Sequence, residues 1–117
     1  MAEERGWFSF ERLEVYQVGM EFRRLSKRII AQLPPDSADD ADQLKRSAKS
    51  IVRNICEGAG EFRRAEKTRF YRMSLRSAEE SGGTLRILME DYGEKEEYLE
   101  AQQLLLRIIP MVIALCK

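Results

Sequence analysis

The feature that most constrains the fold of this chain is the stretch 43–60, QLKRSAKSIVRNICEGAG. Placed on a helix at about 100° per residue, its apolar side chains fall within roughly 60° of one another. They are Leu44, Ala48, Ile51 and Ile55. The far side carries a cationic stripe of Lys45, Lys49 and Arg53, with Arg46 beside it. The stretch therefore predicts a helix that buries one face and offers the other for binding or assembly, with no sign of a catalytic centre.

Helical periodicity extends over the rest of the chain. Apolar spacing and breaker residues predict helices over residues 10–33, 40–58, 65–92 and 96–116. Pro34 and Pro35 end the first helix because proline donates no backbone hydrogen bond, and Gly58 and Gly60 are expected to stop the second. Four helices of about 20 residues joined by short loops indicate an all-α, antiparallel up-down-up-down four-helix bundle. We expect residues 1–117 to form it as a single domain.

The spacing also predicts particular caps and core positions. Ser9 is the expected N-cap of the first helix. The expected inward residues are Phe70, Met73, Ser77, Thr84, Leu88 and Tyr92 in the third helix, and Leu99, Leu105, Ile109, Val112 and Leu115 or Cys116 in the fourth. Gly82 and Gly83 each cost the third helix about 1 kcal/mol against alanine, which a close approach by another helix would offset. Pro110 should kink the fourth helix or open a backbone bond near Leu106.

Composition argues against several classes of function. The chain has no histidine and two cysteines, Cys56 and Cys116, which are far apart in sequence. We therefore expect no structural zinc, no catalytic residues, no cofactor and none of the Ser-His or Cys-His pairs of hydrolases. Residues 1–7 lack the apolar segment of a signal peptide, and the apolar stretch 104–116 is interrupted and too short to span a bilayer. These features predict free thiols, a cytoplasmic location and no membrane partner.

Two motifs have both a functional and a structural interpretation. The glycines Gly58 and Gly60 lack the Lys-Ser/Thr that completes a phosphate loop and follow a helix, so a helix stop is the better interpretation. The carboxylates Glu57, Glu79 and Glu80 could be ligands of a di-metal bundle, but such sites also use histidines. They are better explained as parts of i, i+4 pairs with arginines: Arg53–Glu57, Arg76–Glu80 and Arg86–Glu90.

Charge is unevenly distributed along the chain, although the formal net charge is zero. Residues 44–76 hold ten basic and three acidic groups, a net charge of +7. Residues 77–100 hold two basic and eight acidic groups, a net charge of −6. A chain with this pattern can attract nucleic acid, or can attract a second copy of itself head-to-tail.

The basic side chains of the second and third helices and the turn between them are the candidate nucleic-acid-binding site. They are Lys45, Lys49, Arg53, Arg63, Arg64, Lys67, Arg69, Arg72 and Arg76. Antiparallel packing is expected to bring the two helical stripes near each other, as a phosphate-contacting surface for RNA or DNA. The alternative is a solvated face neutralised by a neighbour's acidic segment. Phe62 and Tyr71 are the only candidates for stacking on bases, so readout of base sequence has little support.

An ordered set of residues resembles a known family. In the second helix the set comprises Gln43-Leu44, Arg46, Ala48, Ser50-Ile51, Asn54-Ile55 and Glu57-Gly58, with Arg69-Phe70 and Ser77 further on and Phe10, Leu13, Val15 and Tyr16 upstream. From about residue 8 to its end, the chain resembles the small bacterial four-helix-bundle proteins encoded in intervening sequences of 23S ribosomal RNA genes. The chain departs from the family pattern at Arg76, Gly82, Gly83 and Pro110. These departures bear on the packing of the last two helices and on the number of subunits in any ring that the protein forms.

The resemblance implies a non-enzymatic protein that forms cyclic homo-oligomers, often five-fold rings. Related accessory variability determinant proteins assist the reverse transcriptase of diversity-generating retroelements, so nucleic acid and a reverse transcriptase or another protein are implied partners. Two functions stay open: a nucleic-acid-binding accessory module, and an oligomeric scaffold or protein-partner adaptor with no nucleic-acid role. In either case we expect a homo-oligomer, because the apolar residues of the first helix cover more than one face. The resemblance implies that this homo-oligomer is a pentamer. Leu13, Tyr16 and Met20 lie apart from Val15, Phe22 and Ile29.

Overall fold

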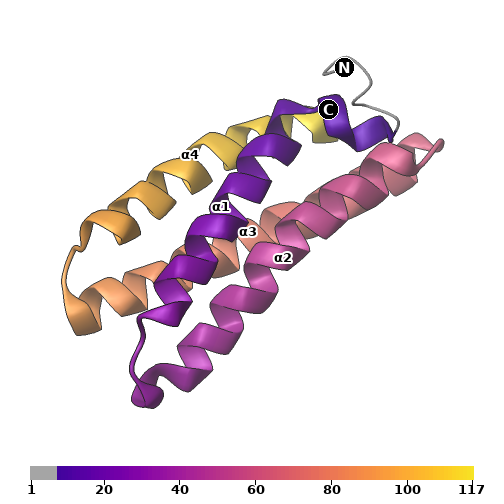
Figure 1. Ribbon diagram of the computed structural model, residues 1–117. Helices are drawn as coiled ribbons and strands as arrows, with labels where there is room; N and C mark the ends of the chain where they lie inside the picture. The colour runs from indigo at the N-terminus through magenta and orange to yellow at the C-terminus, as the bar shows by residue number, and fades with distance from the viewer. Residues whose placement is uncertain (1–7) are drawn as a thin grey trace.

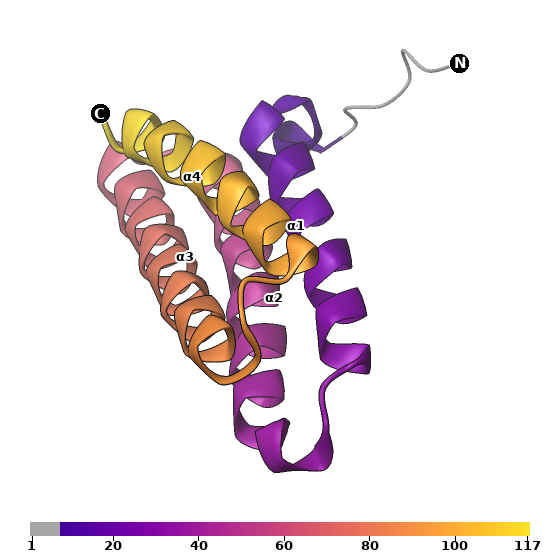
Figure 2. The ribbon, with the colours of Figure 1, turned by 90° about the vertical axis from the view of Figure 1, so that its left-hand side faces the viewer.

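The computed structural model describes residues 8–117, and within them every regular element is helical. The elements are the 3₁₀ turn η2 (Ser9–Arg12), α1 (Glu14–Ala31), the 3₁₀ turn η3 (Pro35–Ser37), α2 (Ala38–Gly60), α3 (Arg64–Tyr92) and α4 (Glu96–Cys116). Each helix packs against the next and α4 packs back against α1, as Figure 1 and Figure 2 show. The predicted four-helix bundle is confirmed. Residues 1–7, on which the expectation of no signal peptide rests, lie outside the described residues.

Consecutive helices run in opposite directions, because the chain turns back at each connection (Figure 1). The hydrogen bonds between α2 and α3 confirm that these two helices are antiparallel, because the residue numbers of the bonded partners rise on one helix as they fall on the other. They join Ser47 to Ser81, Ser50 to Ser77 and Ile51 to Ser74. The ion pairs Glu14–Arg107 and Arg28–Glu97 connect α1 and α4 in the same antiparallel order.

The core is built from one buried stripe per helix. The apolar stripe of α2 is buried as predicted, with Leu44, Ile51 and Ile55 each 0% exposed. Facing it, α1 contributes Val15, Val18, Phe22, Leu25 and Ile29. Burying a side chain of this size stabilises the fold by about 1.5–3 kcal/mol, so these stripes determine how the helices are oriented.

The first helix begins later than predicted. Residues 9–12 form a separate 3₁₀ turn, Leu13 is extended, and α1 starts at Glu14. Ser9 lies within that turn and does not cap a helix. The aromatic ring of Phe10 stacks on Phe8 and packs against Tyr16, with centroids 5.5 and 4.9 Å apart. This aromatic cluster folds the turn back onto α1, which is why the predicted single helix over 10–33 is interrupted.

Gly58 does not stop α2, which continues to Gly60. A Cβ atom at Gly58 would lie 2.5 Å from the ring of Tyr71, so the glycine instead permits a close approach of α3. Among residues 8–117 a positive φ occurs at Gly93, where it is 89° and ends α3 as predicted. The prediction was therefore wrong about Gly58 because glycine also serves close packing between helices.

The inward face of α3 differs from the predicted one. Ser77, Thr84 and Leu88 are buried, but Met73 is 42% exposed, and Phe70 and Tyr92 are only half-buried. The remaining inward places belong to Tyr71, Ser74, Ala78, Ser81 and Leu85. The apolar pattern missed Ser74 and Ser81 because they are small polar residues that hydrogen-bond to α2.

No close helix approach accounts for Gly82 and Gly83. A Cβ atom at Gly82 would meet Leu105 Cδ1 at an ordinary contact distance of 3.9 Å. A Cβ atom at Gly83 would meet nothing within 4 Å in the part of the chain that the structure describes. The expected compensation for the two glycines is therefore not found.

Helix α4 continues through Pro110 as one helix, and the Leu106 carbonyl lacks an amide donor there because proline has none. Leu105 and Val112 are buried as predicted, whereas Leu99 is 38% exposed. Leu104 and Ile108 are buried in addition, and Ile109, Leu115 and Cys116 are half-buried. The stretch 104–116 is part of this longer helix, which as a whole is long and apolar enough to cross a membrane, a test that core helices of globular proteins also pass.

Candidate nucleic-acid interface

A row of small polar side chains determines which faces of α2 and α3 meet. The Ser47 and Ser81 hydroxyls lie 2.7 Å apart, and the Ser74 hydroxyl donates to the Ile51 carbonyl at 2.8 Å. Small side chains let the helix backbones approach, and the hydrogen bonds satisfy hydroxyls that are cut off from water. Ser47 lies on the flank of the α2 stripe that faces α3. The cationic residues of α2 therefore lie on the other flank, next to α1.

The cationic stripe of α2 lines a groove between α1 and α2. Two adjoining hollows of about 380 and about 160 Å³ make up the groove and share Arg23 and Lys49 in their walls. We call this feature the α1–α2 groove and define it by its cations: Arg23, Lys27, Lys45, Lys49 and Arg53. Arg23 is half-buried and the other four are exposed. The ion pairs formed by residues 8–117 include none of these five side chains.

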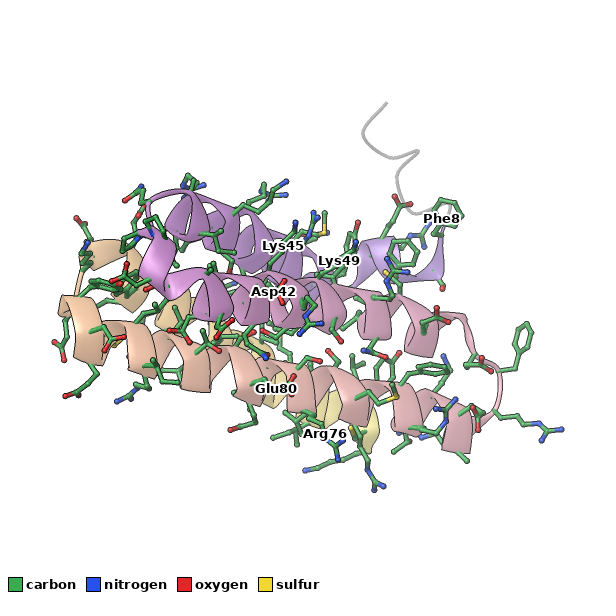
Figure 3. The ribbon with its side chains drawn as sticks, turned by 90° about the horizontal axis from the view of Figure 1, so that it is seen from below. Phe8, Asp42, Lys45, Lys49, Arg76 and Glu80 are labelled. Atoms are coloured by element: carbon green, nitrogen blue, oxygen red, sulfur yellow. The ribbon has the colours of Figure 1, made fainter. Side chains whose placement is uncertain are left out.

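The cations of α3 lie elsewhere. Arg69, Arg72 and Arg76, here called the α3 patch, line a separate hollow of about 580 Å³. Figure 3 shows Lys45 and Lys49 on the side of α2 next to α1, and Arg76 on the far side of α3. The prediction that antiparallel packing brings the two cationic stripes together is therefore wrong, because the serines occupy the junction between the helices.

Two of the predicted cations are already engaged within the chain. Lys67 is half-buried, and its Nζ donates to the carbonyls of Gly58 and Ala59 at 3.2 Å each. The Gly58 carbonyl also accepts from the Glu61 amide at 3.2 Å, and a cation at this position adds a favourable interaction with the last carbonyls of α2. In the α3 patch, the Arg69 guanidinium pairs with Glu66 at 2.9 Å. Lys67 thus has a structural role, and Arg69 is partly neutralised.

The turn between α2 and α3 carries the exposed Arg63 and Arg64 next to Phe62, which is 98% exposed. Tyr71, the other predicted stacking residue, is only 4% exposed and lies against Gly58. Burial raises the pKa of the Tyr71 hydroxyl. Of the two aromatic residues predicted to stack on bases, only Phe62 is therefore available.

Sequence reasoning missed the contribution of α1 to the groove. Arg23 and Lys27 are four residues apart, so they share one face of α1. Their spacing was visible in the sequence, and each of the two cations directly follows a buried residue, Phe22 or Ser26. What the spacing alone could not show is that this face lies beside α2.

The groove holds no activated nucleophile. Cys56 lines the larger hollow. Burial raises the pKa of its thiol, Glu57 raises it further, and Arg53 opposes these effects only in part. The thiol is therefore protonated at neutral pH, when it is a poor nucleophile. Within residues 8–117 there is no group of three or more acidic or cysteine side chains that could hold a metal ion.

The carboxylates are not paired as predicted. None of the pairs Arg53–Glu57, Arg76–Glu80 and Arg86–Glu90 lies within ion-pair distance. The ion pairs of residues 8–117 are instead Arg28–Glu97, Arg46–Asp42, Arg69–Glu66 and Arg107–Glu14. Exposed pairs of long side chains gain little free energy, because attraction in water barely exceeds the entropy lost. Correct spacing therefore did not suffice to form them.

A model of the 23S rRNA-intervening sequence protein family matches residues 11–114. The chain belongs to this family. The match includes all of α1, α2 and α3 and most of α4, so the α1–α2 groove lies entirely within the shared region. The predicted family is confirmed, while the relation to accessory variability determinant proteins stays a prediction. No curated protein sequence matches the chain.

This member of the family also has an apolar outer face on α4. Leu99, Leu106 and Ile113 follow one another at intervals of seven residues, and they are 38%, 56% and 40% exposed. Only 28% of the most apolar stretch of α4 is buried. A hollow of about 390 Å³ beside this face is lined in part by Gly82 and Gly83 of α3.

The apolar residues of α1 do not form the exposed face predicted for assembly. Leu13 and Tyr16 are half-buried and pack against the core, and Met20 is half-buried in the wall of the α1–α2 groove. Of the exposed apolar side chains in the described part of the chain, Leu99, Leu106 and Ile113 of α4 follow one another along one helix. Exposed apolar faces of this length usually mark an interaction site.

Proposed function

We propose that this protein is a non-enzymatic homo-oligomer that binds the phosphate backbone of RNA or DNA in its α1–α2 groove. The observation that supports this most directly is the set of five cations along one groove, none of them in an ion pair within residues 8–117. A cation neutralised within its own chain gains little by meeting a phosphate. Unpaired cations release condensed counterions from nucleic acid when they bind it, which favours association.

The proposed contacts are with the backbone and not with base edges. The groove lies between two helices, and its lining includes five cations and one carboxylate, Glu57, but no aromatic residue. Phe62, in the turn after α2, is exposed but lies outside the groove. Binding should therefore depend strongly on salt and weakly on base sequence.

The proposed oligomer uses the apolar face of α4 against a second copy of the chain. Charge complementarity favours this partner. Glu96 and Glu100 are exposed on the first turns of α4, and Arg72 and Arg76 of the α3 patch are exposed and form no ion pair within residues 8–117. Head-to-tail contacts between unlike faces close into rings when the rotation permits, so a five-subunit ring fits this arrangement. Each ring would carry one groove per subunit, and repeated weak contacts add up to avidity.

The alternative function is an oligomeric scaffold or protein-partner adaptor with no nucleic-acid role. The exposed face of α4 favours it, because that face supports assembly whether or not the groove binds anything. A cytoplasmic location and a reverse transcriptase or other protein partner remain predictions from the sequence.

Two matched triple variants test the proposed function. One removes groove charges by Lys45→Gln, Lys49→Gln and Arg53→Gln; the other removes α3-patch charges by Arg69→Gln, Arg72→Gln and Arg76→Gln. Binding of a single-stranded RNA is measured over a range of salt concentrations, together with the mass of the oligomer. We expect the groove variant to keep its mass and to lose roughly 0.7–0.9 of log–log salt slope per charge, and the patch variant to change the slope by less.

Three outcomes would contradict the proposal. If both variants reduce the salt slope equally, the site is not in the groove. If the groove variant binds RNA as tightly as the unmodified protein, the groove makes no phosphate contacts. If the unmodified protein binds neither RNA nor DNA at low salt, the scaffold function replaces the one proposed.

A further inference from the structure

Ser26 is an unusual residue in the interior of this bundle. It lies in α1, its side chain is 1% exposed, and its hydroxyl has no hydrogen-bond partner among the described residues. The buried serine and threonine hydroxyls of α2 and α3 are all bonded, for example Ser47 to Ser81 and Ser74 to the Ile51 carbonyl. Buried polar groups in native proteins are nearly always paired, so an unpaired one points to a missing ligand or partner.

The surroundings of Ser26 suit an anion. It lines the smaller hollow of the α1–α2 groove, about 160 Å³, together with Arg23, Lys27, Ile30, Lys45, Ala48 and Lys49. Four of these seven lining residues are cationic and none is acidic. A metal ion or an organic cation would be repelled here, whereas an anion would be attracted by cations from both helices.

The chemistry of the donors favours a tetrahedral oxyanion such as phosphate. The hydroxyl, the ammonium groups and the guanidinium can all donate hydrogen bonds, and a phosphate offers several acceptor oxygens in a tetrahedral arrangement. Ile30 and Ala48 supply a small apolar part of the wall that needs no hydrogen bond. The long cationic side chains have rotational freedom, so they can move to admit the anion and then close on it.

We propose that this hollow is a phosphate-binding subsite in which the Ser26 hydroxyl donates a hydrogen bond to one phosphate oxygen while Lys45 and Lys49 balance the charge. The phosphate belongs either to a nucleic-acid backbone or to a free phosphate ion. For the first source the inference rests on the proposed function; for the second it stands independently of it.

The test uses the full-length chain and two probes, inorganic phosphate and a short single-stranded RNA. Ser26→Ala removes the hydroxyl, Lys49→Gln removes one charge, and Arg24→Gln is the matched control. Arg24 is an exposed cation of the same helix that does not line the groove. Calorimetric titration gives the affinity for each probe, and a melting curve shows that each variant folds.

We expect Ser26→Ala to weaken phosphate binding about tenfold or more, as for the loss of one hydrogen bond to a charged group. Its melting temperature should be equal or higher, because the change removes a buried hydroxyl that has no hydrogen-bond partner among residues 8–117. Lys49→Gln should also weaken phosphate binding severalfold. Arg24→Gln should change it by less than about twofold, since that charge is solvent-screened.

The possible outcomes separate this inference from the proposed function. Weaker binding of both probes by Ser26→Ala supports the subsite as part of the nucleic-acid surface. Weaker phosphate binding in a protein that binds no RNA supports a free-phosphate subsite and contradicts the proposed function. If Ser26→Ala leaves the affinity for RNA unchanged, and phosphate binding is also unchanged or absent, the subsite is overturned but the proposed function is not. The subsite is also overturned if Arg24→Gln weakens phosphate binding as much as Lys49→Gln does, because phosphate would then be attracted by the general positive charge of the surface.

Discussion

The contact between Gly58 and Tyr71 shows how a single residue determines the spacing of two helices. Tyr71 is 4% exposed and its ring lies where a Cβ atom at position 58 would be, at 2.5 Å. Beside this contact, the Lys67 ammonium binds the Gly58 and Ala59 carbonyls. The glycine therefore permits both the burial of an aromatic ring and the capping of α2 by a residue of α3.

At this scale we predict that Gly58→Ala lowers the free energy of unfolding by about 1–3 kcal/mol. The added methyl group would overlap the Tyr71 ring, and neither backbone nor ring can move far in a packed core. Gly60→Ala is the matched control, because a Cβ atom there meets nothing within 4 Å. Urea denaturation compares the two variants, and equal stability would show that Tyr71 does not occupy this place in solution.

Helix α3 shows how an element can combine a well-packed and a poorly packed part. Its buried serines hydrogen-bond to α2, and Leu85 and Leu88 belong to the core. Gly83 is exposed and a Cβ atom there would meet nothing within 4 Å, while a Cβ atom at the half-buried Gly82 would meet Leu105 of α4 only at an ordinary 3.9 Å. Glycine in a helix interior loses more conformational entropy on folding than alanine does, so this part of α3 is weakened without a gain within the chain.

At the scale of the element we predict that Gly83→Ala raises the free energy of unfolding by about 0.5–1 kcal/mol, because the methyl group enters open space and the helix loses a flexible residue. Thermal unfolding followed by circular dichroism measures the change. A lower melting temperature would contradict the prediction, and would indicate that another copy of the chain occupies the space beside Gly83.

The molecule has three distinct surfaces: the α1–α2 groove, the α3 patch and the apolar face of α4. The groove and the patch lie on different sides, as Lys45, Lys49 and Arg76 show in Figure 3. The face of α4 is exposed along its length, with Leu106 at 56%. Under the proposed function, this separation would let the face of α4 assemble copies of the chain while the groove binds a phosphate backbone.

At the scale of the molecule we predict that Leu106→Glu dissociates the oligomer, because a carboxylate in the middle of an apolar interface would be buried without a partner. Light scattering should then give the 13.6 kDa mass of one chain, against about five times that mass for the unmodified protein. Ile87→Glu, a similar change at a 50% exposed residue of α3, is the control and should leave the mass unaltered. An unmodified protein that is monomeric at tens of micromolar would contradict the prediction.

The sequence by itself determined the helical class, three of the four helix spans to within a few residues, and the buried face of α2. These follow from local rules: a period of about 3.6 residues and the backbone limits of proline and glycine act within a few residues. The tertiary structure alone decided which faces meet. It placed serines between α2 and α3, brought Arg23 and Lys27 of α1 beside the cations of α2, and left the buried hydroxyl of Ser26, a residue that lines the groove, without a hydrogen-bond partner among the described residues. Such outcomes depend on shape and packing between segments far apart in sequence, where small and polar residues fit as well as apolar ones and leave no periodic signal.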